Sequence, residues 1–244
     1  MALGGVRQPP CQDRDRLGAA AATPEGRETP SPRAQPTPLK SALIYLRSPP
    51  LTTEDFEGFV TPQRLAQHNK DLAAAAYQGL VVVCPYLPDV DLKSPLAIKD
   101  YGDFVKEVLL PRVRRELPVF ASRDATGIDG VSLGGAMALR VGLGNPDCFG
   151  MVGSLQAAID DPQIPQFVEA LKLARASNPK LKLRLLTSDR DYFRRVVTAT
   201  SQAMRSAALD HDFLEVPGPH DYPFNRGPGA IEMLTWYDRG LARS

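Results

Sequence analysis

The sequence is poor in the residues that form disulfides and bind metals. Its 244 residues include only three histidines and three cysteines. Cys11, Cys84 and Cys148 lie far apart and form no C-x-x-C pair. This spacing indicates neither a disulfide framework nor a zinc site. We therefore expect no bound metal.

Long apolar runs and an excess of one charge are also missing. The longest apolar stretches, such as residues 80–84, are far shorter than the about 20 residues of a membrane-spanning helix. The formal net charge is +1, which gives no electrostatic reason to expect nucleic acid or an anionic membrane as a partner. The N-terminus has no apolar stretch typical of a secretory signal, so we expect a soluble, cytoplasmic protein.

The chain divides by composition near residue 40. Residues 1–40 contain seven prolines, five arginines and no Phe, Tyr, Trp or Ile, and such a segment is expected to be disordered because it cannot offset its chain entropy by burial. Residues 41–244 suffice for one domain. Strand-like and helical patterns alternate along them, which predicts an α/β fold with a mostly parallel sheet of about six strands flanked by helices. The expected strands are residues 42–46, 80–84, 127–131, 151–155, 183–186 and 213–216.

The most informative motif is a serine between two glycines. Gly130-Val131-Ser132-Leu133-Gly134 lies where an apolar run gives way to helix-forming residues. This is the pattern of a nucleophile elbow, in which a strained strand-to-helix turn exposes the serine and the helix N-terminus supplies amide hydrogens to an oxyanion. The motif therefore predicts Ser132 as a nucleophile and the Leu133 amide as an oxyanion donor.

A serine nucleophile in such a fold needs a carboxylate and then a histidine later in the chain. His68 and His211 lie in polar segments and are expected at the surface, whereas His220 follows an apolar-alternating run in a turn-rich loop. Two carboxylates, Asp189 and Asp191, compete just past the strand expected at 183–186. Asp191 is favoured because two aromatic residues that could shield it come next, whereas Asp189 could instead cap the following helix.

At this point the sequence resembles a known family. Gly-Val-Ser-Leu-Gly-Gly followed by Ala-Leu-Arg, the stretch at residues 145–155, and the Gly-Pro-His-Asp-Tyr at residues 218–222 are similar to motifs of the putative esterase family of α/β-hydrolases. That family includes esterase D, feruloyl esterases and mycolyltransferases. The resemblance covers about residues 41–243 and favours Asp191, which precedes His220 by 29 positions.

The resemblance implies a serine carboxylic ester hydrolase that forms an acyl-enzyme and needs no cofactor. Its substrate would be a small-molecule, glycan or lipid ester. Two alternatives stay open: an acyltransferase that uses the same three residues, and a weakened, hydrolase-like binding module. The resemblance also implies two N-terminal antiparallel strands, which this sequence lacks.

The expected oxyanion loop departs from the family pattern. Family members usually carry a His-Gly pair after the first core strand, whereas this chain reads Arg47-Ser48-Pro49-Pro50. Proline has no amide hydrogen, so the second oxyanion donor is expected to be the Ser48 amide, and the enzyme is expected to be slow. Losing one such donor costs about 2.7–4 kcal/mol of transition-state stabilisation.

Apolar and aromatic residues follow two of the expected strands. Tyr86 and Leu87 come after the second strand, and Tyr222 and Phe224 come after His220. Loops at the carboxyl ends of parallel strands surround the ligand site of such folds. We therefore expect these four side chains to line an acyl or aryl pocket.

Overall fold

The computed structural model describes residues 41–46, 62–86 and 94–241. The expected disordered tail and two expected site residues, Ser48 and Leu87, lie outside these residues. No helix among the described residues is long and apolar enough to cross a bilayer.

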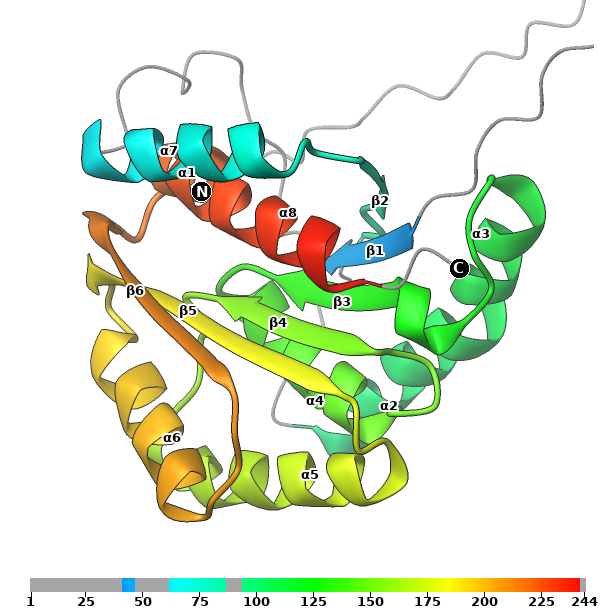
Figure 1. Cartoon of the computed structure of the whole chain (residues 1–244). Coiled ribbons are helices and arrows are strands. Elements are labelled where there is room, and N and C mark those ends of the chain that lie inside the picture. Colours follow the sequence, from blue (N-terminus) through cyan, green and yellow to red (C-terminus); the bar gives the residue numbers. More distant parts are fainter. Residues whose placement is uncertain (1–40, 47–61, 87–93, 242–244) are drawn as a thin grey trace, which may run out of the picture. The chain divides into compact units, whose positions relative to one another are not determined.

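A six-stranded sheet forms the centre of the fold, in the order β2-β1-β3-β4-β5-β6 (Figure 1). Every pair of neighbouring strands in this sheet is parallel. The predicted α/β fold with a parallel sheet is therefore confirmed. The strands are β1 (Ser41–Leu46), β2 (Leu80–Val83), β3 (Thr126–Gly130), β4 (Met151–Leu155), β5 (Lys182–Arg190) and β6 (Asp212–Pro219).

Helices cover both faces of the sheet, as parallel strands require (Figure 1). One face carries α2 (Pro95–Asp103), α4 (Leu133–Gly144), α5 (Ile164–Ser177) and α6 (Arg194–Ser206), and the other carries α1 (Pro62–Ala74), α7 (Tyr222–Arg226) and α8 (Pro228–Gly240). The remaining helical segments are η1 (Phe104–Leu109), α3 (Leu110–Glu116), η2 (Arg123–Ala125) and η3 (Asp161–Gln163).

Helix α4, which follows the candidate nucleophile, packs directly on the middle of the sheet. Most of its side chains are buried, including Met137 and Leu139, which have no exposed surface. A Cβ at Gly142 would lie only 2.7 Å from side-chain atoms of Ile128 and Val152. Glycine at this position thus allows the helix to approach β3 and β4 closely, which fixes the direction in which α4 leaves the sheet.

Pro111 lies inside a continuous helical stretch. A π-helical turn, η1, precedes the proline, and the Leu110 amide donates to the Val105 carbonyl five residues back. Proline removes one helical hydrogen bond, and the wider turn lets the chain continue as α3 to Glu116. The proline therefore follows a change of helical pitch and does not terminate the helix.

A buried ion pair lies behind the strand that leads to Ser132. Asp129, the one unfavourable residue of that strand, is fully buried, and its Oδ2 lies 2.9 Å from Nη2 of Arg184, which is also buried. The Gly130 amide donates to Asp129 Oδ1 at 2.7 Å. Burial raises the pKa of Asp129 to about 6, although Arg184 and this amide oppose the shift. The sequence around Asp129 does not show Arg184, the cation on β5 that pairs with this carboxylate.

His68 was expected at the surface, and the structure contradicts this. The side chain is buried between α1 and α8, and its Nε2 lies 3.0 Å from Glu232 Oε1. The prediction failed because the polar sequence around His68 does not show the carboxylate of Glu232 on α8, which pairs with its ring. His211, the other such histidine, is partly buried and contacts the Ser201 hydroxyl at 2.8 Å.

Candidate active site

Three predicted site residues meet at the carboxyl edge of the sheet. Ser132 follows β3, Asp191 follows β5 and His220 follows β6. The carboxyl ends of parallel strands lie at one edge, where ligands of open α/β sheets bind. Residues distant in sequence are thereby brought into contact.

Ser132 sits on a strained turn between β3 and α4. Its φ of 55° and ψ of −117° lie outside the regions that L-residues prefer. The turn is tight enough that a Cβ at Gly130 would lie 2.3 Å from the Gly134 carbonyl oxygen. Its geometry is maintained by main-chain bonds from Ser132 N to Leu155 O at 2.9 Å and from Ala158 N to Ser132 O at 2.9 Å. The serine hydroxyl is therefore held at a fixed position above the helix N-terminus.

A chain of hydrogen bonds joins the serine to a carboxylate through His220. The Oγ of Ser132 lies 3.1 Å from Nε2 of His220, and Nδ1 of the same ring lies 2.6 Å from Oδ1 of Asp191. The Asp191 side chain has no exposed surface, and that of His220 is 13% exposed. This geometry suits proton transfer, because a base must lie within hydrogen-bond distance of the proton that it removes.

Asp191 is held by two further donors. The Thr187 hydroxyl donates to Oδ2 at 2.7 Å, and the Phe193 amide donates to Oδ1 at 3.0 Å. The competing Asp189 instead accepts from the Gly218 amide at 2.8 Å, and its side chain is 49% exposed. Of the two candidates, Asp191 is the one in contact with His220.

The Leu133 amide lies at the N-terminus of α4, next to the serine hydroxyl. The first amides of a helix have no intrahelical acceptor, and the helix dipole makes this end attractive to negative charge. Among the described residues, none accepts a hydrogen bond from the Leu133 amide. Ser48, the second expected donor, lies outside the described residues.

The expected pocket residues occupy different environments. Tyr86 is 79% exposed and Tyr222 is 45% exposed, whereas Phe224 has no exposed surface. Phe224 packs in a small core with Leu155 and Leu186 beneath the histidine loop. The expectation that Phe224 lines the pocket is therefore wrong, because the short helix α7, which sequence patterns missed, turns its ring inward.

Two aromatic rings flank His220. The ring of Tyr192 lies 5.3 Å from the imidazole, centroid to centroid, and that of Phe193 lies 5.6 Å away. Tyr192 is 82% exposed. The sequence suggested that these residues shield Asp191, but their ring contacts are with the histidine. Their position directly after a strand end was the available signal.

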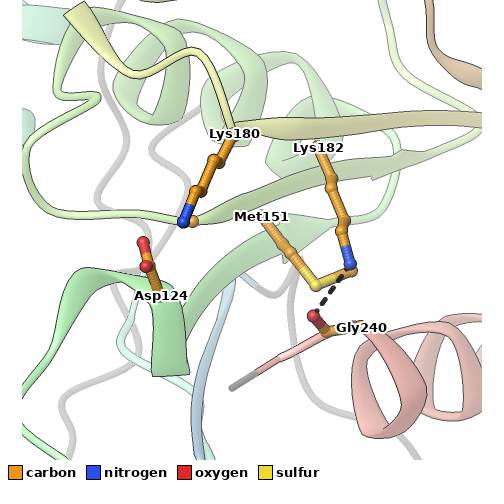
Figure 2. Close-up of a pocket in the computed structure, with 6 residues that line it drawn as sticks. Asp124, Met151, Lys180, Lys182 and Gly240 are labelled. Carbon is orange, nitrogen blue, oxygen red and sulfur yellow. Dashed lines mark hydrogen bonds between the residues drawn. The ribbon is translucent and has the colours of Figure 1, made fainter.

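A hollow lies at the opposite edge of the sheet from the candidate active site (Figure 2). It has a volume of about 180 Å³ and is lined by Asp124, Gly150, Met151, Lys180, Lys182 and Gly240. Ligand pockets usually measure about 300–1,000 Å³, and Lys182 already donates to the Gly240 carbonyl at 3.1 Å. We do not assign the reaction to this hollow. No group of three potential metal ligands occurs among the described residues.

A parallel α/β sheet with a serine on a strained turn after a central strand defines the α/β-hydrolase class. Three solved structures support this classification of the fold. S-formylglutathione hydrolase (FrmB) from Staphylococcus aureus is 16% identical, with a TM-score of 0.58 over 84% of this chain and 86% of that one. FphF, a fluorophosphonate-binding serine hydrolase from the same organism, is 18% identical, with a TM-score of 0.59 over 88% and 89%. A ferulic acid esterase from Anaeromyces mucronatus is 16% identical, with a TM-score of 0.54 over 84% and 80%.

The sequence itself places the chain in one family of that class. Residues 90–223 match the family described as Putative esterase, and the match spans more than half of the chain. The chain belongs to this family and is a hydrolytic enzyme of the α/β-hydrolase type.

Proposed function

We propose that the chain hydrolyses carboxylic esters through Ser132, His220 and Asp191. The observation that carries the proposal is the hydrogen-bond chain from the Ser132 hydroxyl through both ring nitrogens of His220 to Asp191. Each of these side chains stands after a different strand, so their convergence depends on the whole sheet.

In the first half-reaction, Ser132 Oγ attacks the carbonyl carbon of the ester while His220 Nε2 takes its proton. The Leu133 amide, and as a prediction the Ser48 amide, donates to the oxygen that becomes negative. His220 then protonates the leaving alcohol, and the serine is left acylated. Asp191 keeps Nδ1 protonated and stabilises the imidazolium that forms.

In the second half-reaction, His220 Nε2 removes a proton from water, which attacks the acyl carbon. The imidazolium then returns that proton to Ser132 Oγ as the acyl–oxygen bond breaks and the acid leaves. The substrate proposed is a small-molecule, glycan or lipid ester. The roles of Tyr86, Tyr222 and Leu87 in its binding stay predictions. Transfer of the acyl group to a sugar or lipid alcohol is tested by adding that alcohol to the ester assay.

Labelling with a fluorophosphonate tests the proposal, because the probe reacts with an activated serine. The wild type should be labelled, and Ser132→Ala should lose both the label and hydrolysis of p-nitrophenyl esters while its circular dichroism spectrum stays the same. The chain offers a matched control in Ser201, which contacts His211 at 2.8 Å but has no carboxylate behind that histidine. Ser201→Ala should keep the label. Unchanged labelling of Ser132→Ala would refute the assignment.

A further inference from the structure

Gln156 is a fully buried glutamine beside the three proposed catalytic residues. It directly follows β4, the strand between the one that leads to Ser132 and the one that leads to Asp191. Its φ of 49° lies in the left-handed region, which non-glycine residues adopt at a cost. Its Oε1 has no hydrogen-bond partner among the described residues. The positive φ and the unpaired Oε1 both cost stability, so the contacts of Nε2 are what favours glutamine here.

The side-chain amide of Gln156 joins two catalytic loops. Its Nε2 donates to the Ser188 hydroxyl at 2.6 Å and to the Pro219 carbonyl at 2.9 Å. The Pro219 carbonyl belongs to the peptide bond that leads into His220, and the Ser188 carbonyl accepts from the Asp191 amide at 3.2 Å. A carbonyl only accepts, so the NH₂ group of the amide must face Pro219.

The main chain around Gln156 is attached to the serine turn and to β5. Ser132 N donates to Leu155 O and Ala158 N donates to Ser132 O, each at 2.9 Å. Gln156 N donates to Leu186 O at 2.7 Å. Residues 155–158 thus connect the turn that carries the serine with the segments that carry the carboxylate and the histidine, and Gln156 makes the contacts with the latter two.

We propose that Gln156 is a positioning residue that sets the distances between Ser132, His220 and Asp191. The inference rests on the proposed function of these three residues. Its physical basis is that catalysis depends on fixed geometry: a shift of about 1 Å in a reacting group costs on the order of 100-fold in rate. Two hydrogen bonds to the loops therefore affect turnover more than they affect folding.

Asn178 provides a matched control for the loss of a buried amide. It is also fully buried, its Nδ2 donates to the carbonyls of Pro146 and Phe149 at 3.2 Å each, and its Oδ1 has no partner among the described residues. It lies after α5, away from the proposed catalytic residues. Asn178→Leu removes the same chemistry without touching the catalytic loops.

The experiment compares Gln156→Met and Asn178→Leu with the wild type. Both variants should lower the melting temperature. Gln156→Met should lower kcat for a p-nitrophenyl ester by about 10- to 100-fold with little change in KM, whereas Asn178→Leu should keep kcat within about threefold. Gln156→Gly, which suits the positive φ but lacks the amide, should be as slow as Gln156→Met. Wild-type kcat in Gln156→Met or Gln156→Gly would overturn the inference.

Proton NMR separates failure of this inference from failure of the proposed function. The Nδ1 proton of His220, which lies in the short contact with Asp191, should resonate far downfield in the wild type whether or not an ester is turned over. Gln156→Met should shift or broaden this resonance, and Asn178→Leu should not. An unchanged resonance in Gln156→Met overturns the inference even in a protein that no fluorophosphonate labels. If the fluorophosphonate does not label the wild type but the resonance still depends on Gln156, the proposed function is refuted and the inference about Gln156 stands.

Discussion

Asp191→Asn tests how the proposed acid holds His220, because the two oxygens of Asp191 have different partners. Oδ1 faces His220 Nδ1 and the Phe193 amide, and Oδ2 faces the Thr187 hydroxyl. Asparagine replaces one oxygen by NH₂. The Phe193 amide can only donate, whereas a threonine hydroxyl can also accept. The asparagine oxygen should therefore take the Oδ1 position and keep Nδ1 of His220 protonated.

The expected loss of activity follows from that orientation. Only the negative charge disappears, and a hydrogen bond to a charged group contributes about 1.5–3 kcal/mol against about 0.5–1.5 kcal/mol for a neutral one. The difference of about 1–2 kcal/mol corresponds to roughly 5- to 30-fold in kcat/KM. If NH₂ faced the ring instead, Nε2 would carry the proton and could not act as a base. The loss would then be about 10⁴-fold.

The assay is steady-state hydrolysis of p-nitrophenyl acetate by the wild type and the variant. Asp189→Asn is the matched control. Asp189 accepts a hydrogen bond from the Gly218 amide at 2.8 Å, and the asparagine oxygen can still accept it. The activity of this variant should therefore equal that of the wild type. A loss near 10⁴-fold in Asp191→Asn would refute the proposed orientation. A loss no larger than that of Asp189→Asn would refute Asp191 as the acid.

Three further predictions concern stability. Burial raises the pKa of Asp129 to about 6 in the folded protein, above the ordinary value of 3.8. The stability that it contributes is therefore fully present at low pH and is lost as the pH rises through about 6. Asp129→Asn should lower the free energy of unfolding more at about pH 5 than at about pH 7. An equal loss at both pH values would contradict this. Phe224→Ala should lower the free energy of unfolding in urea by about 3–5 kcal/mol, whereas Tyr222→Ala should change it by less than about 0.5 kcal/mol, and similar costs would show that Phe224 is not a core residue. Deletion of residues 1–38 should leave the melting temperature nearly unchanged, because that segment has no apolar pattern, and a loss of many degrees would show that it docks.

The fold and the candidate triad could be predicted because their signals are local in the sequence. Alternating strand and helix patterns predict a parallel sheet, and the glycines on both sides of Ser132 predict a tight turn without information from the rest of the chain. Parallel strands then bring the residues that follow them to one edge. The choice between Asp189 and Asp191 needed more than this local pattern, because both directly follow the same run of strand residues.

Partners that come from another strand or helix could not be predicted. Nothing near Asp129 in sequence shows that Arg184 lies 2.9 Å away on β5, and nothing near His68 shows Glu232 on α8. Phe224 was misassigned for the same reason. An aromatic residue after a catalytic histidine can face either the substrate or the core, and the direction depends on a five-residue helix that is too short to show a periodic pattern.

Gln156 combines a feature that the local sequence shows with contacts that only the folded structure shows. Its position directly after a central strand is legible in the sequence, as it is for Ser132 and Asp191, but glutamine has no reactive group that would draw attention to it. The contacts of its amide with Ser188 and with the carbonyl of Pro219 become visible only when three strand ends are brought together. A search of strand ends for nucleophiles and bases alone therefore finds the proposed catalytic residues and misses Gln156, the proposed positioning residue.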